Sequence, residues 1–284
     1  MAPNPLDPHY SSQSTLRTHS VWRDALGRDG GMYTNFLYSS IKGIGKETGI
    51  TRRDPSTVLK IDGKYYVWYT RRSTKYKVRH ELDLDANANV DVDWEIPRFD
   101  WDLSDIYYAT SEDGFSWIEQ GVSARRGPKD QFDGRSVFTP DILMSNGKYF
   151  LYYQAVDHPY GIRTRNVVGM SWSESPDGPW NRFPEPVLKP GKAGEWMGSD
   201  ETNHVNSYGT WDSHKVHDPF VLCRDGKYWL YYKGQPMGWG SDYCSGIGWG
   251  VALADSPYGP FEKYSGNPVT NSGHETCLFP WDTG

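Results

Sequence analysis

One pattern occurs three times in this chain and limits what it can fold into. The three segments are RDPSTVLKIDGKYYVWYTR (residues 53–71), FTPDILMSNGKYFLYYQA (138–155) and HDPFVLCRDGKYWLYYKG (217–234). Each has an apolar strand, an Asp-Gly or Asn-Gly dipeptide, and a second strand that begins with Lys, Tyr and an aromatic residue. These dipeptides are typical of tight hairpins because a type I′ turn needs a positive φ at both central residues. The sequence therefore predicts three copies of one β-hairpin.

A second hairpin follows each copy, in the segments IYYATSEDGFSW, VVGMSWSESPDGPW and WGVALADSPYGPF. Units of about four antiparallel strands, repeated along the sequence, are typical of a β-propeller. A fourth unit begins at GHETCLFPWDTG, where the chain ends. We therefore expect an all-β chain whose residues 49–284 form blades one to three and the start of blade four of a propeller that is incomplete at its C-terminus.

Helical periodicity is confined to residues 11–28, where Leu16, Val21 and Leu26 give a loose apolar stripe after a serine cap. We expect residues 1–48 to form a short helical arm. Such an arm either decorates the propeller or serves in dimerisation.

Composition excludes several classes of protein. The net charge of −6 gives no basic surface for nucleic acid, and no apolar run is long enough to cross a membrane. Three scattered cysteines argue against a disulfide framework and a structural zinc site. The N-terminus lacks the pattern of a signal peptide. We expect a cytoplasmic protein, although a periplasmic protein without its signal would have the same sequence.

Two long insertions, residues 73–105 and 190–216, interrupt the repeats. Loops of this length are usually walls or lids of functional sites, although surface excursions are the alternative. Trp101 in the first insertion is a candidate substrate-binding residue, because an aromatic ring can pack against the C–H face of a sugar.

Aligning the units on their turns places Asp54, Thr139, Asp218 and Glu275 at equivalent positions. In a propeller the first strand of each blade lines the central channel, so these residues should meet near one mouth. Pro55 is expected to hold Asp54 in extended geometry. Three carboxylates close together repel one another and raise the pKa of at least one, which is typical of a chemical site. The structural alternative is that they are unrelated acids at strand starts.

The second strand of each hairpin returns to the same mouth. Its equivalent residues are Thr70, Gln154 and Lys233, each seven residues after the glycine of the turn. We expect Thr139, Gln154 and Lys233 to bind substrate hydroxyls, together with Arg53 and His217 at the same rim.

Carboxyl groups from separate blades supply the proton donor and base that glycoside hydrolysis needs. A metal site is the alternative, since His217, Asp218, His274 and Glu275 offer nitrogen and oxygen ligands. Their spacing lacks a standard zinc signature. We expect no required cofactor, with room for a divalent cation near the channel mouth.

The segments RRDPSTVLKIDGKYYVWYT, HDPFVL with DGKYWLYYKG, and NSGHET resemble glycoside hydrolase family 117, the α-1,3-neoagarooligosaccharide hydrolases. The resemblance covers roughly residues 35–284. It implies a five-bladed propeller, and an inverting enzyme that releases 3,6-anhydro-L-galactose from the non-reducing end of neoagarooligosaccharides. It also implies a homodimer formed through the N-terminal arm.

The resemblance further implies a role for each catalytic residue. Asp54 would be the general base that activates water, and His274 an unusual general acid. Asp218 and Glu275 would hold the substrate and tune the site, with the alternative that His274 only orients Glu275. The runner-up functions are a family 43-like arabinosidase or xylosidase and a non-catalytic carbohydrate-binding propeller.

Overall fold

The computed structural model describes residues 40–73, 94–159, 163–198, 204–238, 247–270 and 278. The chain divides into two compact units, Met1–Ser40 and Ile41–Gly284. The predicted helix of residues 11–28 lies outside the described residues, and the part of the predicted arm that is described, residues 40–48, contains no helix. Among all described residues, only Trp94 and Glu95 are helical, and no described helix has the length and apolarity to cross a membrane.

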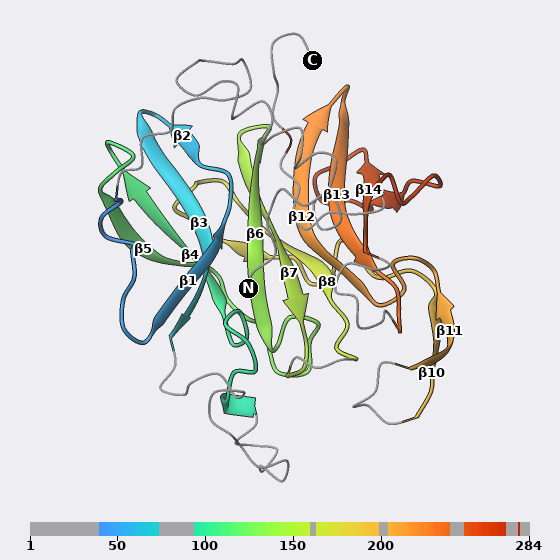
Figure 1. The fold of residues 1–284 in the computed structure, drawn as a ribbon. Coiled ribbons are helices and arrows are strands. Elements are labelled where there is room, and N and C mark those ends of the chain that lie inside the picture. The colour runs from blue at the N-terminus through green and yellow to red at the C-terminus, as the bar shows by residue number, and fades with distance from the viewer. Residues whose placement is uncertain are drawn as a thin grey trace, which may run out of the picture. The chain divides into compact units, whose positions relative to one another are not determined.

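Three antiparallel sheets of four or five strands follow one another along the described part of the second unit (Figure 1). The first contains β1 (Ile50–Pro55), β2 (Leu59–Ile61), β3 (Lys64–Ser73), β4 (Asp105–Ser111) and β5 (Trp117–Ala124). The second contains β6 (Ser136–Ser145), β7 (Lys148–Val156), β8 (Val167–Ser173) and β9 (Asn181–Arg182). The third contains β12 (Lys215–Arg224), β13 (Lys227–Gln235), β14 (Gly248–Ala254) and β15 (Glu262–Lys263). This repetition confirms the all-β prediction, because each sheet is the pair of hairpins expected from the sequence.

The predicted hairpin turns have the expected backbone. Asp62, Asn146 and Asp225 have φ values of 49°, 50° and 52°, and the glycine after each also has a positive φ. A type I′ turn needs this combination, and its twist matches that of the two strands it joins. The Asp-Gly and Asn-Gly dipeptides therefore fix the register of the first hairpin in every sheet.

Serine side chains close the second hairpins. Ser111 Oγ accepts hydrogen bonds from the Asp113 and Gly114 amides at 3.3 and 2.9 Å. Ser175 and Ser256 accept in the same way from the amides two residues later. Because these local bonds satisfy the backbone of the turn, the sequence element is repeated in all three sheets.

The second insertion contains a two-stranded sheet of its own. Its strands β10 (Ala193–Trp196) and β11 (Val205–Gly209) pair antiparallel before β12 begins. In the first insertion, residues 74–93 lie outside the described part of the chain. Residues 94–105 are described and are held by buried polar contacts.

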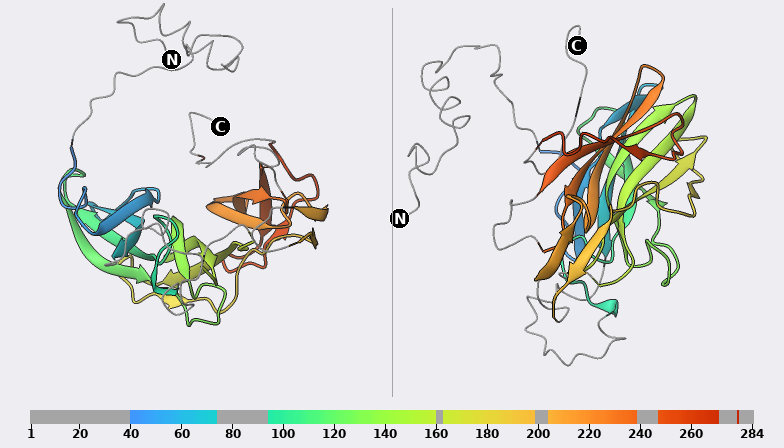
Figure 2. Two further views of the ribbon diagram at one scale, coloured as in Figure 1. Left: turned by 60° about the horizontal axis from the view of Figure 1, so that its bottom comes forward. Right: turned by 90° about the vertical axis from the view of Figure 1, so that its right-hand side faces the viewer.

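Strand β6 lies between the first and third sheets, in contact with β1 and β3 on one side and with β12 on the other. The views of Figure 2 show the same order. One apolar cluster packs the first sheet on the second around Trp68 and Leu151, and another packs the second on the third around Tyr152 and Leu230. All four side chains are fully buried. The first strands of the sheets are therefore neighbours, as the propeller interpretation requires.

Candidate active site

The first strand of every sheet contains a bulge at the position of the aligned site residues. Between Arg53 and Pro55, β1 has one more residue than its partner strand β3. The same surplus occurs between Phe138 and Asp141 and between His217 and Phe220. A bulge re-aims a side chain and commonly lies next to an active site.

The extra residue has a left-handed backbone in all three sheets. Asp54, Thr139 and Asp218 have φ values of 49°, 48° and 50°. The expectation that Pro55 holds Asp54 extended is therefore wrong, because the bulge outweighs the local preference of a residue before proline. Such a conformation costs about 1–3 kcal/mol for a residue other than glycine, and it persists where the surrounding structure imposes it.

Asp218 is the most enclosed of these residues. Its Oδ2 lies 2.5 Å from Lys233 Nζ and 3.8 Å from His217 Nδ1. Its side chain is 8 % exposed and that of Lys233 is 5 % exposed. Since His217 and Lys233 face each other across β12 and β13, the register of this hairpin brings both to the carboxylate.

Asp54 has a more open environment. Arg53 Nε donates to its Oδ2 at 2.8 Å, and the side chains of Arg53 and Asp54 are 40 % and 15 % exposed. Across the strand from Arg53 is Thr70, whose hydroxyl accepts the Thr139 amide at 2.8 Å. This bond connects the bulge of the second sheet directly to the first sheet.

Gln154 occupies the equivalent place in the second sheet. It pairs with Phe138 across β6 and β7, and it is 3 % exposed. Thr70, Gln154 and Lys233 are therefore register-equivalent, as the repeats indicate.

Lys215 is a second buried amine of the β12–β13 hairpin, and its charge interacts with that of Lys233. Burial lowers the pKa of Lys215 to about 7, and the nearby charge of Lys233 acts in the same direction. Lys215 stands two residues before His217 on β12 and faces Gln235 on β13. The start of β12 and the end of β13 therefore carry a group of buried polar side chains, namely Lys215, His217, Asp218, Lys233 and Gln235.

Trp101 lies beside the bulge of the second sheet. Its ring stacks on Phe138, with centroids 4.7 Å apart, and on Phe99 at 5.0 Å. Phe138 is 3 % exposed and Phe99 is 42 % exposed. The three rings therefore run from the buried Phe138, which precedes Thr139, to the exposed Phe99.

A buried ion pair holds the segment that carries Trp101. Arg135 Nε and one terminal nitrogen donate to the two carboxylate oxygens of Asp102, both at 2.8 Å, and neither side chain is exposed. Arg135 also donates to the carbonyls of Trp94 and Ile96. Sequence reasoning missed this pair, although an arginine beside an apolar strand is a signal of buried pairing.

Arg52 and Arg71, which flank the predicted site on β1 and β3, both contact a carboxylate of β5. Arg52 and Arg71 both donate to Glu119 of β5, at 2.9 and 3.1 Å, and the Tyr69 hydroxyl donates to it at 2.8 Å. Burial raises the pKa of Glu119, but the hydrogen bonds and the arginine charges outweigh burial and leave it below its ordinary value. Arg52 and Arg71 therefore bind β5, and among the described site carboxylates Asp54 is paired with Arg53.

Asp141 is a buried acid that sequence reasoning missed. It follows Thr139 by two residues on β6 and is 5 % exposed, and it contacts Thr57, between β1 and β2, and Val221 on β12. The signal was a carboxylate within the apolar strand FTPDILM.

His274 and Glu275 lie outside the described residues, so their predicted roles remain predictions. Within the described ranges, no three His, Cys, Asp or Glu side chains are grouped to hold a metal ion. The residues of the alternative metal site are divided between the described and undescribed parts.

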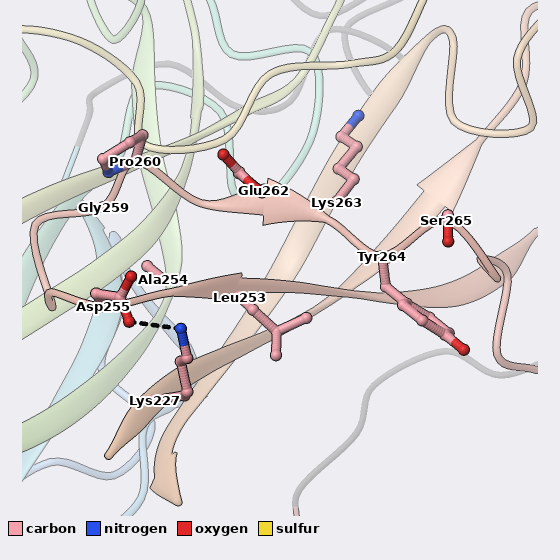
Figure 3. Close-up of a pocket in the computed structure, with 10 residues that line it drawn as sticks. All are labelled: Lys227, Leu253, Ala254, Asp255, Gly259, Pro260, Glu262, Lys263, Tyr264 and Ser265. Carbon is pink, nitrogen blue, oxygen red and sulfur yellow. Dashed lines mark hydrogen bonds and ion pairs between the residues drawn. The ribbon is translucent and has the colours of Figure 1, made fainter. Parts of the chain in front are cut away.

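A surface pocket of about 440 Å³ lies at the outer side of the third sheet (Figure 3). Lys227 and Asp255 pair there at 2.6 Å, and Glu262 and Tyr264 also line it. These residues belong to the start of β13 and the β14–β15 region, whereas Asp218 is on β12. The pocket is thus separate from the bulges.

Comparison with solved structures shows a relative of known family. Zg3597, a family 117 glycoside hydrolase produced by the marine bacterium Zobellia galactanivorans, is 41 % identical in sequence, with a TM-score of 0.67. The alignment covers 86 % of this chain and 65 % of that protein. The resemblance found in the motifs is confirmed, and the chain spans just under two thirds of the length of this relative.

More distant structures share the fold. A glycoside hydrolase is 14 % identical with a TM-score of 0.53, and the alignment covers 93 % of this chain and 67 % of that protein. BT0996, in an RGII complex, is 13 % identical with the same TM-score, and the alignment covers 92 % and 66 %. No protein-family model and no curated protein matches the chain.

Proposed function

We propose that this chain, a relative of the family 117 glycoside hydrolases, cleaves α-1,3 bonds of neoagarooligosaccharides from the non-reducing end. The proposed product is 3,6-anhydro-L-galactose, and the proposed mechanism inverts the anomeric configuration. The observation that carries the proposal is the repeated bulge, which gives Asp54 and Asp218 one strained backbone geometry on two sheets. The 41 % identity to Zg3597 supports the hydrolase class.

In this proposal Asp54 is the general base. Its carboxylate accepts a hydrogen bond from Arg53 and keeps part of its surface exposed, so a water molecule has access to it. A carboxylate can activate water for attack on the face of the sugar opposite the leaving group.

Asp218 has a different proposed role. Lys233 pairs with its carboxylate at 2.5 Å, and both side chains are buried. A carboxylate that is neutralised in this way suits binding of substrate hydroxyls and control of the electrostatic potential in the site better than removal of a proton from water. The proposed acid is His274, because an imidazole near its ordinary pKa can donate a proton at neutral pH. Glu275 is proposed to hold substrate beside it.

Arg53, Thr139, Gln154, His217 and Lys233 are the proposed substrate-binding residues, with Trp101 at the margin. Gln154 and Lys233 occupy register-equivalent places on two sheets, and Thr139 is the bulge residue of the second sheet. We further propose that the whole protein closes as five blades and dimerises through the arm of residues 1–48.

Substrate comparison tests the proposed function. The full chain is incubated with neoagarobiose and, in parallel, with aryl arabinosides and aryl xylosides. Release of 3,6-anhydro-L-galactose with the aryl glycosides intact is expected. Release of the aglycone with neoagarobiose untouched would favour a family 43-like activity, and binding without any hydrolysis would favour a carbohydrate-binding protein.

A further inference from the structure

Asp141 on β6 bonds to β12 of the third sheet and to the segment that joins β1 and β2 of the first sheet. Its Oδ2 accepts the backbone amide of Val221 on β12 at 3.0 Å, and its Oδ1 accepts the Thr57 hydroxyl at 3.5 Å. The backbone amides of Thr57 and Ile142 also donate to this carboxylate. A single side chain on β6 thus bonds to the segment after β1 and to the middle of β12.

These partners have a regular relation to the bulges. Thr57 follows Asp54 by three residues, Val221 follows Asp218 by three, and Asp141 follows Thr139 by two. A shift of Thr57 or Val221 relative to Asp141 therefore moves the neighbouring bulge. The bond between the Thr70 hydroxyl and the Thr139 amide joins the first and second sheets at the bulge itself.

The contacts are specific for a carboxylate. Asp141 is 5 % exposed, and its recorded partners are donors, namely a hydroxyl and backbone amides. The two oxygens of a carboxyl group can accept from several donors at once, whereas an amide of the same shape replaces one oxygen with an NH2 group and turns two N–H donors toward some of them. A buried donor without an acceptor is costly, so substitution should loosen these segments.

We propose that Asp141 is a positioning residue that fixes the separation of the Asp54 and Asp218 carboxylates. It acts through Thr57 and Val221 and does not itself touch the substrate. The inference rests on the proposed function, because the separation of site carboxyls governs how water reaches an inverting centre. Misplacement by about 1 Å can cost about 10²-fold in rate.

The test compares Asp141→Asn with Tyr228→Phe. Tyr228 also joins the second and third sheets, because its hydroxyl bonds to Ser145 at 2.8 Å, but it lies next to the hairpin turns rather than the bulges. Asp141→Asn should lower kcat on neoagarobiose about 10²-fold with a much smaller change in KM, and Tyr228→Phe should leave both near wild type. A purely structural role would lower the amount of folded protein without lowering kcat of the folded fraction.

Hydrogen exchange supplies a readout that needs no substrate. In Asp141→Asn, the amides of Ser56, Thr57, Phe220 and Val221, which follow the two bulges, should exchange faster than in wild type and in Tyr228→Phe. Unchanged exchange in both segments, or a kcat equal to that of Tyr228→Phe, would overturn the proposal. Thr57→Val removes the hydroxyl donor to Asp141 with little change of shape. It should lower kcat and speed amide exchange in the same segments, but less than Asp141→Asn. If Asp141→Asn does not fold, the result for Thr57→Val tests the positioning role in its place.

The two proposals fail in different ways. If wild type leaves neoagarobiose intact, the proposed function is wrong, and the exchange data still show whether Asp141 holds the two segments. If wild type is active and Asp141→Asn matches it in kcat and exchange, only the positioning role is wrong.

Discussion

Asp54 and Asp218 have the same left-handed backbone, with φ of 49° and 50°, at the same bulge of two different sheets. Glycine would adopt this conformation without strain, and asparagine is among the residues that tolerate it best. The chain instead places a partly buried carboxylate at each position. This combination of a left-handed backbone and a partly buried charge supports the catalytic roles that we propose for these residues.

Asp54→Asn tests the general base. The amide keeps the shape and tolerates the left-handed backbone, but it cannot take a proton from water. We expect kcat on neoagarobiose to fall about 10²–10⁴-fold while the melting temperature stays close to wild type. The matched control is Asp62→Asn, because Asp62 has the same φ of 49° in an exposed hairpin turn. Equal activity of the two variants would remove Asp54 from the mechanism.

Lys233→Met tests the buried pair with Asp218. Removing one partner of a buried ion pair leaves the other charge uncompensated, which typically costs about 3–5 kcal/mol. Denaturant unfolding should show this loss, and adding Asp218→Asn should recover part of the stability without recovering activity. Lys227→Met is the control, since the Lys227–Asp255 pair has side chains 50 % and 84 % exposed and should cost less than about 1 kcal/mol. Similar losses from the two single variants would contradict the burial argument.

Arg135→Lys tests the support of Trp101. Lysine keeps the charge but cannot form the two-pronged contact with Asp102. We expect KM to rise several-fold as the segment around Trp101 shifts, with a smaller effect on kcat. Arg182→Lys disrupts a comparable pair with Asp133, at 2.5 and 2.6 Å, on the outer strand β9. It should destabilise the protein without raising KM, and an equal rise in both variants would argue against a role for Trp101 in binding.

The ionisation of Asp141 should be visible in the pH dependence of stability. Burial raises its pKa from the ordinary 3.8 to about 7, against opposing hydrogen bonds from Val221, Ile142 and Thr57. The partner across the strand is the buried Tyr152, and burial also raises the pKa of that phenol. A raised acid pKa means that the folded state holds the proton more tightly than the unfolded state.

The contribution of Asp141 is therefore fully present below about pH 4 and is lost as the pH rises to about 7. The loss is about 4 kcal/mol across that window, because each pKa unit corresponds to about 1.4 kcal/mol. The unfolding free energy of wild type minus that of Asp141→Asn should therefore fall by about 4 kcal/mol between about pH 4 and pH 7. A difference that does not depend on pH would show that the carboxyl titrates normally.

The strands and turns were predictable because their signals are local. The Asp-Gly and Asn-Gly turns have the predicted positive φ, and the serine-rich segments form the second hairpins. Aligning the turns also matched Thr70, Gln154 and Lys233, because strand register fixes which residues are equivalent. Periodic sequence was sufficient for these features.

Contacts between residues far apart in the sequence were not predictable in the same way. The bulge that gives Asp54 a positive φ depends on pairing with β3, so the preference of a residue before proline gave the wrong geometry. Glu119 lies far along the sequence from Arg52, and nothing local connects them. Asp141 and Arg135 find partners in other segments, and single-sequence patterns do not show which segments meet.

The anomeric configuration of the released sugar tests the central claim of the proposed mechanism, which is direct attack by a water molecule that Asp54 activates. The full chain is mixed with neoagarobiose, and the anomeric proton of the first-formed 3,6-anhydro-L-galactose is followed by NMR. We expect inverted configuration, since a water activated by Asp54 attacks opposite the leaving group. Retained configuration would rule out this role of Asp54, because retention requires two successive displacements at the anomeric carbon and not one direct attack by water.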